Sequence, residues 1–270
     1  MSVRTKPKSY QALQTKSGGC LSSSFELIGE EPLLIRIDDK PYSVVMRTPG
    51  FELYQAAGFC LGEGIADSAD DFKTVGYDEQ SDPNTIDIWL TPERREKIKD
   101  LLKRRGFVSQ TSCGICGKEM IEDLYQKVTP VADGFEIEID QILDCIDKLS
   151  ENQNFYQSTR CSHAALLFDE QLQVLSFAED VGRHNALDKA IGKVFMDRSL
   201  SKAKILVLSS RNSYELVQKA ARAQLPIVIS NSRATALAVE MGKALNMTLV
   251  FPAGESEIAI MCGQQRIKRV

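Results

Sequence analysis

The spacing of hydrophobic residues along the chain predicts both strands and helices. Apolar and polar residues alternate in "TIDIWL" (85–90), which predicts a strand with one buried face. Helical spacing in "DQILDCIDKLS" (140–150) predicts an amphipathic helix. The runs "ILVL" (205–208) and "IVI" (227–229) have no polar alternation, so we expect strands buried on both faces of a sheet.

The second half of the chain alternates between short apolar runs and helical patterns, as layered α/β proteins do. The predicted order is strands at 163–169 and 172–180, a helix at 184–195, a strand at 204–210, a helix at 213–223, a strand at 226–230, a helix at 234–245, a strand at 247–251 and an edge strand at 256–262.

The first half has a mixed pattern. Residues 32–48 predict a hairpin, and further strands are expected at 74–79 and 84–90. The dipeptides Thr48-Pro49 and Thr91-Pro92 each predict a helix start, with threonine as the cap and proline as the first helical residue. Another helix is expected at 117–126, after the cysteine segment described below.

These patterns predict three parts: a flexible polar tail at 1–20, a mixed α+β subdomain at 21–110, and a layered α/β domain at 111–270.

Composition and charge narrow the class of protein. The chain has 270 residues, 43% of them hydrophobic and 26% charged, which is ordinary for a globular protein with its own core. A net charge of -4 argues against nucleic acid as the main partner. No apolar run approaches the ~20 residues of a membrane span, and no secretory signal opens the chain, so we expect a cytoplasmic protein without a membrane partner.

The segment "TSCGICGKEM" (111–120) holds the strongest candidate chemistry. Seven cysteines in a reducing compartment argue against a disulfide framework, so Cys113 and Cys116 need another role. A zinc site would need two more ligands, for which Cys161 and His163 are available. A thioredoxin-type redox pair is a second interpretation, because the predicted helix after Gly117 would lower the thiol pKa.

Sulfur transport is a third interpretation of the same pair. The segment reads as a mobile loop, and a low-pKa thiol on a flexible arm can receive sulfur as a persulfide. The neighbouring thiol can then help to release the sulfur by attacking it. Burial as two packed cysteines is the fourth interpretation, although "CGICG" offers little apolar bulk for a core.

Polar residues also gather where predicted strands end and helices begin. "EDVGRHNALDK" (179–189) includes Arg183 and His184, and "SSRNS" (209–213) includes Arg211 and Ser213. These side chains could hold an anionic or nucleotide-like ligand, since helix N-termini and arginines favour phosphate. The alternatives are a hydrogen-bonded structural corner in the first segment and a simple helix cap at Ser213.

"NSRAT" (231–235) repeats this pattern after the next strand. Three such junctions of one sheet would meet at one edge, which predicts a pocket for a large phosphorylated ligand within reach of the cysteine loop.

The sequence as a whole resembles the FdhD family of formate dehydrogenase accessory sulfurtransferases. The resemblance runs from about Glu31 to the C-terminus, and two of its motifs together are highly specific. The matching segments are "MRTPG" (46–50), "GFCLGEGI" (58–65), "SCGICGK" (112–118), "EDVGRHNALDK" (179–189) and "SSRNSYELVQKA" (209–220).

The resemblance implies a three-layer α/β/α core like that of cytidine deaminases, and a homodimer. It implies that Cys113 accepts sulfur from a cysteine desulfurase as a persulfide, with help from Cys116. The sulfur would pass to the molybdenum (or tungsten) bis-molybdopterin guanine dinucleotide cofactor, bound as a substrate, before its insertion into formate dehydrogenase. No tightly held metal of the protein's own is expected. A cofactor-binding chaperone without sulfur chemistry is the alternative.

By position, the resemblance also assigns cofactor contacts to a stretch after the strand at 247–251. This stretch consists of Phe251, Pro252, Ala253, Gly254, Glu255 and Ser256.

Overall fold

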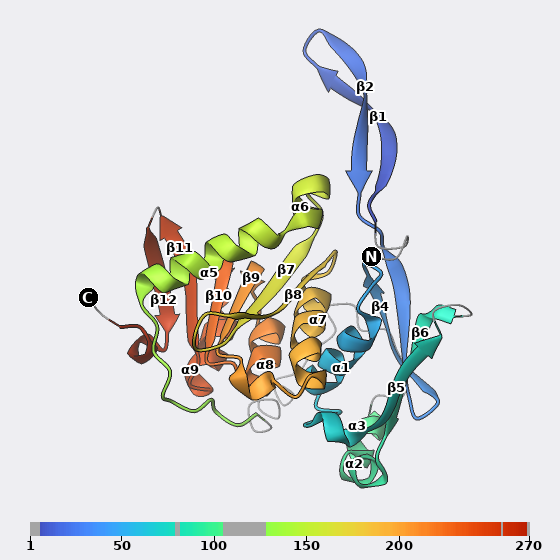
Figure 1. Cartoon of the computed structure of the whole chain (residues 1–270), viewed down its shortest axis with the longest axis vertical. Coiled ribbons are helices and arrows are strands. Elements are labelled where there is room, and N and C mark those ends of the chain that lie inside the picture. Colours follow the sequence, from blue (N-terminus) through green and yellow to red (C-terminus); the bar gives the residue numbers. More distant parts are fainter. Residues whose placement is uncertain (1–5, 79–81, 105–127, 255, 269–270) are drawn as a thin grey trace.

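A computed structural model describes residues 6–78, 82–104, 128–254 and 256–268 of the chain. Two sheets lie side by side with helix α1 (Glu52–Gly62) between them, and a two-stranded ribbon projects from one end (Figure 1).

The smaller sheet has the strand order β4-β3-β6-β5. Its inward face carries apolar residues at every second position, as the alternation in 85–90 predicts. Two short helices follow its last strand, and Thr91 caps the first of them through its side chain, as expected. The elements are β3 (Glu31–Ile37), β4 (Lys40–Arg47), β5 (Phe72–Asp78), β6 (Asp82–Leu90), α2 (Pro92–Lys97) and α3 (Lys99–Arg104).

The larger sheet has six strands in the order β12-β11-β10-β9-β7-β8. Strands β9, β10 and β11 are parallel, and the other pairs are antiparallel. The edge position predicted for the last strand is therefore correct. The strands are β7 (His163–Phe168), β8 (Val174–Asp180), β9 (Ile205–Asn212), β10 (Ile227–Ala234), β11 (Thr248–Gly254) and β12 (Glu257–Cys262).

Helices cover both faces of this sheet. Strand residues such as Leu166 and Val207 pack with α5 (Ile139–Asn152) on one face. Their neighbours Leu167 and Leu206 point to the other face, which three further helices cover. These helices are α7 (Arg183–Met196), α8 (Tyr214–Arg222) and α9 (Ala236–Ala244). The predicted α/β class is confirmed, whereas the likeness to cytidine deaminases stays a prediction.

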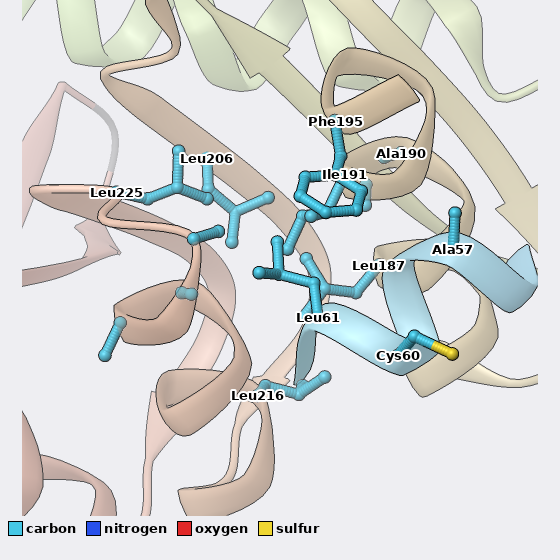
Figure 2. Close-up of a cluster of buried hydrophobic side chains, with 14 of the residues drawn as sticks. Ala57, Cys60, Leu61, Leu187, Ala190, Ile191, Phe195, Leu206, Leu216 and Leu225 are labelled. Carbon is cyan, nitrogen blue, oxygen red and sulfur yellow. The ribbon is translucent and has the colours of Figure 1, made fainter. Parts of the chain in front are cut away.

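One apolar cluster joins the two halves of the chain. Ala57 and Leu61 of α1 pack with Leu187 and Ile191 of α7 beneath the six-stranded sheet (Figure 2). Each leucine or isoleucine of this cluster contributes roughly 1.5–3 kcal/mol when fully buried. Helix α1, which falls within the predicted subdomain 21–110, thus shares its core with the predicted domain 111–270.

Two glycines allow α1 and α7 to approach this closely. A Cβ at Gly58 would lie 2.0 Å from the backbone oxygen of Asp188, and one at Gly192 would lie 1.8 Å from that of Tyr54. A side chain at either position would therefore push the helices apart.

The expected helix start at Thr48-Pro49 is wrong by several residues. Helix α1 begins at Glu52, after Phe51 in a left-handed conformation (φ 62°). The reason is a tertiary contact: the backbone of Thr48 is bound by Asp180 and Lys189 of the second half. Those bonds hold the segment outside the helix.

The N-terminal segment also differs from the expectation of a flexible tail at 1–20. Lys8–Lys16 form β1, which pairs along its whole length with β2 (Gly19–Leu27). The polar composition of both strands hides the pattern that usually reveals a hairpin. Among the described residues, no helix has the length and hydropathy needed to cross a membrane.

Candidate functional site

The candidate site lies along the edge of the six-stranded sheet that is formed by the carboxyl ends of β8, β9 and β10, not along an outer strand. Strand β7 is antiparallel to both of its neighbours, β8 and β9, and β10 is parallel to β9. Strands β8, β9 and β10 therefore end at the same edge, where β7 begins with His163. The predicted convergence of the three polar junctions is confirmed.

The buried carboxylate of Asp180 organises the first junction. It accepts hydrogen bonds from the backbone of Thr48 (3.0 Å) and Gly182 (2.8 Å), and from the side chains of Asn185 (3.0 Å) and Lys189 (2.6 Å). Burial lowers the pKa of Lys189, while the nearby Asp180 opposes that shift. This network fixes the start of α7 against the segment before α1.

Glu179, the neighbouring acid, has a different structural role. Its carboxylate accepts hydrogen bonds from the backbone nitrogens of Phe155 (2.8 Å) and Tyr156 (2.9 Å), and from the Ser162 hydroxyl (2.7 Å). It thereby holds the first turn of α6 (Asn154–Thr159) beside the sheet edge.

Asp188 and Lys219 form a third buried contact, between α7 and α8. The lysine Nζ donates to both carboxylate oxygens, at 2.6 and 2.5 Å. Burial raises the pKa of Asp188 and the lysine counteracts it. The structural interpretation of the 179–189 segment is thus correct for its acids and its lysine, which all have partners inside the protein.

Arg183 and His184 belong to the same segment and are the first two residues of α7. His184 Nε2 is 3.0 Å from Glu215 Oε2 of α8, and this contact lowers the pKa of Glu215. Burial lowers the pKa of His163, with a further contribution from the positive charge of Arg183. The positive charge of Arg211 shifts the pKa of His163 in the same direction.

Several buried polar atoms at this edge have no hydrogen-bond partner among the described residues. They are Arg183 Nε, both amide atoms of Asn212, and Ser213 Oγ. Ser213 occupies the cap position of α8, but its side chain makes no capping bond. Because unpaired buried polar atoms are costly, a polar ligand that bonded to these atoms would gain affinity from them.

Asn212 was missed by the sequence analysis. It is 1% exposed at the end of β9, between the two predicted residues Arg211 and Ser213. Its position at a strand-to-helix junction was a signal that could have identified it. The amide offers one donor side and one acceptor side, which suits a nucleobase edge or a phosphate oxygen.

At the third junction, between β10 and α9, one polar side chain already has a partner within the protein. Thr235 caps α9 by accepting a hydrogen bond from the backbone of Ala238 (3.3 Å). Arg233 remains exposed at the same edge.

Residues 251–254, the last four of β11, lie at the same edge, beyond β10. Phe251, Pro252 and Gly254 end β11 and pair with β12, and Ser256 follows with a positive φ of 58°. At about 4.8 Å per strand, β11 lies about 10 Å from β9. Ala253 is exposed, and Glu255 falls outside the described residues.

The predicted sulfur-carrying residues Cys113 and Cys116 also fall outside the described residues, as does the helix expected at 117–126. Cys161, the third ligand of the zinc interpretation, is exposed. The described part of the chain contains no group of three or more His, Cys, Asp or Glu side chains arranged to hold a metal.

Comparison with known proteins gives consistent matches. A sequence model of the FdhD/NarQ family matches residues 28–268. A protein named "Sulfur carrier protein FdhD" from Streptomyces coelicolor is 32% identical over 267 residues, covering 95% of this chain and 94% of its own. Its namesake in Mycobacterium tuberculosis is 37% identical over 240 residues, covering 84% and 86%.

A solved structure is also similar in fold. The crystal structure of a putative formate dehydrogenase accessory protein from Desulfotalea psychrophila matches with a TM-score of 0.78 at 22% identity. The match covers 97% of this chain and 100% of that one.

Proposed function

Because this chain belongs to the FdhD/NarQ family, we propose that it is a sulfur carrier in the maturation of formate dehydrogenase. In this proposal, a cysteine desulfurase supplies the sulfur and Cys113 carries it as a persulfide. The receiving substrate is the molybdenum (or tungsten) bis-molybdopterin guanine dinucleotide cofactor. The protein acts as a homodimer in the cytoplasm.

Loading is a thiol exchange reaction. The Cys113 thiolate attacks the outer sulfur of the donor's persulfide and forms a new sulfur–sulfur bond. The donor's bond to that sulfur breaks, and the donor leaves as its own cysteine thiolate. No net oxidation occurs, because the outer sulfur moves from one thiolate to another.

Delivery uses the second cysteine. The Cys116 thiolate attacks the inner sulfur of the Cys113 persulfide, which forms a disulfide and releases the outer sulfur as hydrosulfide. The bound cofactor would take up this hydrosulfide in exchange for an oxygen ligand, which leaves as hydroxide. A cellular dithiol then reduces the disulfide for the next cycle.

The observation that carries the binding step is the group of unpaired polar atoms at Arg183, Asn212 and Ser213. Together with the exposed Arg211, they suit the phosphates and the base of a guanine nucleotide. Residues 251–254 are available at the same edge for the rest of this extended ligand. In this proposal, Asp180 and Glu179 hold neighbouring backbone segments in place and do not contact the ligand.

The test of sulfur transfer is intact-protein mass spectrometry. After incubation with a cysteine desulfurase and cysteine, the wild-type mass should increase by that of one sulfur atom. Cys113→Ala should abolish the increase, whereas the matched variant Cys161→Ala, which alters an exposed thiol elsewhere in the chain, should retain it. Equal sulfur gain in Cys113→Ala would show that this residue is not the carrier.

A second readout separates sulfur transfer from a pure chaperone role. A Cys113→Ala/Cys116→Ala variant should fail to support formate dehydrogenase activity in cells that lack the native protein. Full support by this variant would favour cofactor binding without sulfur chemistry.

A further inference from the structure

Four arginines without an ion pair gather at the edge where β8, β9 and β10 end. Seven of the eleven arginines whose side chains the structure describes pair with a carboxylate. The other four are Arg160, Arg183, Arg211 and Arg233.

All four lie at this edge, although they come from separate elements. Arg183 opens the helix after β8, and Arg211 and Arg233 are the penultimate residues of β9 and β10. Arg160 comes three residues before β7, which begins at the same edge. In a chain with a net charge of -4, this edge therefore offers unpaired guanidinium groups to an external anion.

Among these four, only Arg160 lies over an aromatic ring in the described part of the chain. Its guanidinium carbon is 5.3 Å from the centre of the Tyr156 ring, about one helical turn earlier. Tyr156 is 40% exposed, and Arg160 is exposed as well. One face of the planar guanidinium is thus turned to the tyrosine, and the opposite face is accessible to a ligand.

The segment that carries this pair is anchored to the sheet on both sides of it. Glu179, the penultimate residue of β8, accepts hydrogen bonds from the backbone nitrogens of Phe155 and Tyr156. The same carboxylate accepts a hydrogen bond from the Ser162 hydroxyl, two residues after Arg160. Because its backbone is already fixed, the pair loses less conformational entropy when a ligand binds than a free loop would.

We propose that Tyr156 and Arg160 form the stacking site for the base of the bound nucleotide, with the guanidinium between the tyrosine ring and the base. A guanidinium plane stacks on aromatic rings, and bases stack on arginine in the same way. Arg183 and Arg211 then hold the phosphates. This inference rests on the proposed function, because it places one part of the ligand assigned there.

The spacing along the edge suits one nucleotide. Strand β7 lies between β8, which anchors α6, and β9, which carries Arg211. At about 4.8 Å per strand, the ends of β8 and β9 are about 10 Å apart. This separation is comparable with the length of a nucleoside diphosphate from its base to its terminal phosphate.

Calorimetric titration with guanosine diphosphate and with inorganic pyrophosphate tests the stack, because the second probe has no ring. Arg160→Lys keeps the charge and removes the planar group. It should raise the dissociation constant for guanosine diphosphate by at least about fivefold, and that for pyrophosphate by less than about twofold. Arg198→Lys, the same exchange at an exposed arginine paired with Asp70, should bind both probes as wild type does.

A second pair of variants tests the positioning role of Tyr156. Tyr156→Ala removes the ring beneath the guanidinium and should weaken binding of guanosine diphosphate by at least about threefold. Tyr156→Phe keeps the ring and should bind as wild type does. A lower melting temperature of Tyr156→Ala with unchanged affinity would assign the ring to the stability of α6 and overturn the proposal.

Two results with Arg160→Lys would also overturn it. An equal loss of affinity for both probes would make Arg160 a phosphate contact, and an unchanged affinity for guanosine diphosphate would place the base elsewhere. In either case binding by wild type would leave the proposed function standing. Failure of wild type to bind either probe would refute the stack together with the nucleotide site of the proposed function.

Discussion

The short segment 179–189 supplies two groups of polar side chains that differ in whether their bonds are complete. Asp180, Asp188 and Lys189 are at most 3% exposed and are fully engaged with partners from α8 and from the segment before α1. Arg183, the fifth residue of the same segment, retains an unpaired buried nitrogen, as Ser213 and Asn212 retain unpaired atoms at the end of β9.

This contrast separates support from binding within one motif. The first group fixes the position of α7, and the second presents atoms that a ligand can pair. Removing a residue of the first group should cost stability, and removing one of the second should cost ligand affinity.

The largest expected effect is on the buried network. Asp180→Ala would leave the Lys189 ammonium buried without its carboxylate, so the free energy of unfolding should fall by about 3–5 kcal/mol. Asp197→Ala, which removes the exposed ion pair with Lys193, should cost less than about 0.5 kcal/mol. Urea unfolding measures both, and a similar small loss in the two variants would show that the network is not a support.

The next effect concerns the helix crossing on which this network depends. Gly192→Ala places a methyl group against the backbone of Tyr54, and we expect a loss of about 3 kcal/mol from overpacking. Gly76→Ala on β5, where a Cβ meets nothing within 4 Å, should change stability by less than about 1 kcal/mol. The same unfolding experiment compares the two, and equal losses would argue against close contact of α1 and α7.

The smallest expected effect is the pH dependence of stability that His163 causes. The pKa of His163 lies below its ordinary value of 6.5, so the unfolded chain binds a proton before the folded one as pH falls. Stability should therefore decrease below about pH 6.5 through the lowered pKa. His163→Gln should lose less stability than wild type between about pH 7.5 and about pH 5.5. An identical pH profile in the variant would contradict the shift.

Much of this arrangement could be predicted because it follows from local pattern. Buried strands such as 205–208 and the amphipathic helix at 140–150 have clear periodicity, and strand order brought the polar junctions to one edge. Features that depend on contacts between residues far apart in the sequence could not be predicted from local pattern. Bonds from Asp180 and Lys189 keep Thr48 outside helix α1, although the local sequence favours a helix start there.

The ribbon shows the second limit of sequence pattern. Its strands carry polar residues on both faces, so no apolar run marks them, and only the pairing register shows that Tyr10 and Phe25 meet. Asn212 shows a third limit, because an asparagine at a strand end is common and only its burial without a partner makes it notable.

Calorimetric titration with guanosine diphosphate tests most directly whether the unpaired atoms form the ligand site. Relative to wild type, Arg183→Ala should weaken binding by at least about tenfold, with the free energy of unfolding changed by less than about 1 kcal/mol. Arg198→Ala, which removes an exposed arginine paired with Asp70, should bind as wild type does. Equal affinity of wild type and Arg183→Ala, or no binding by wild type, would contradict the assignment of this edge as the nucleotide site.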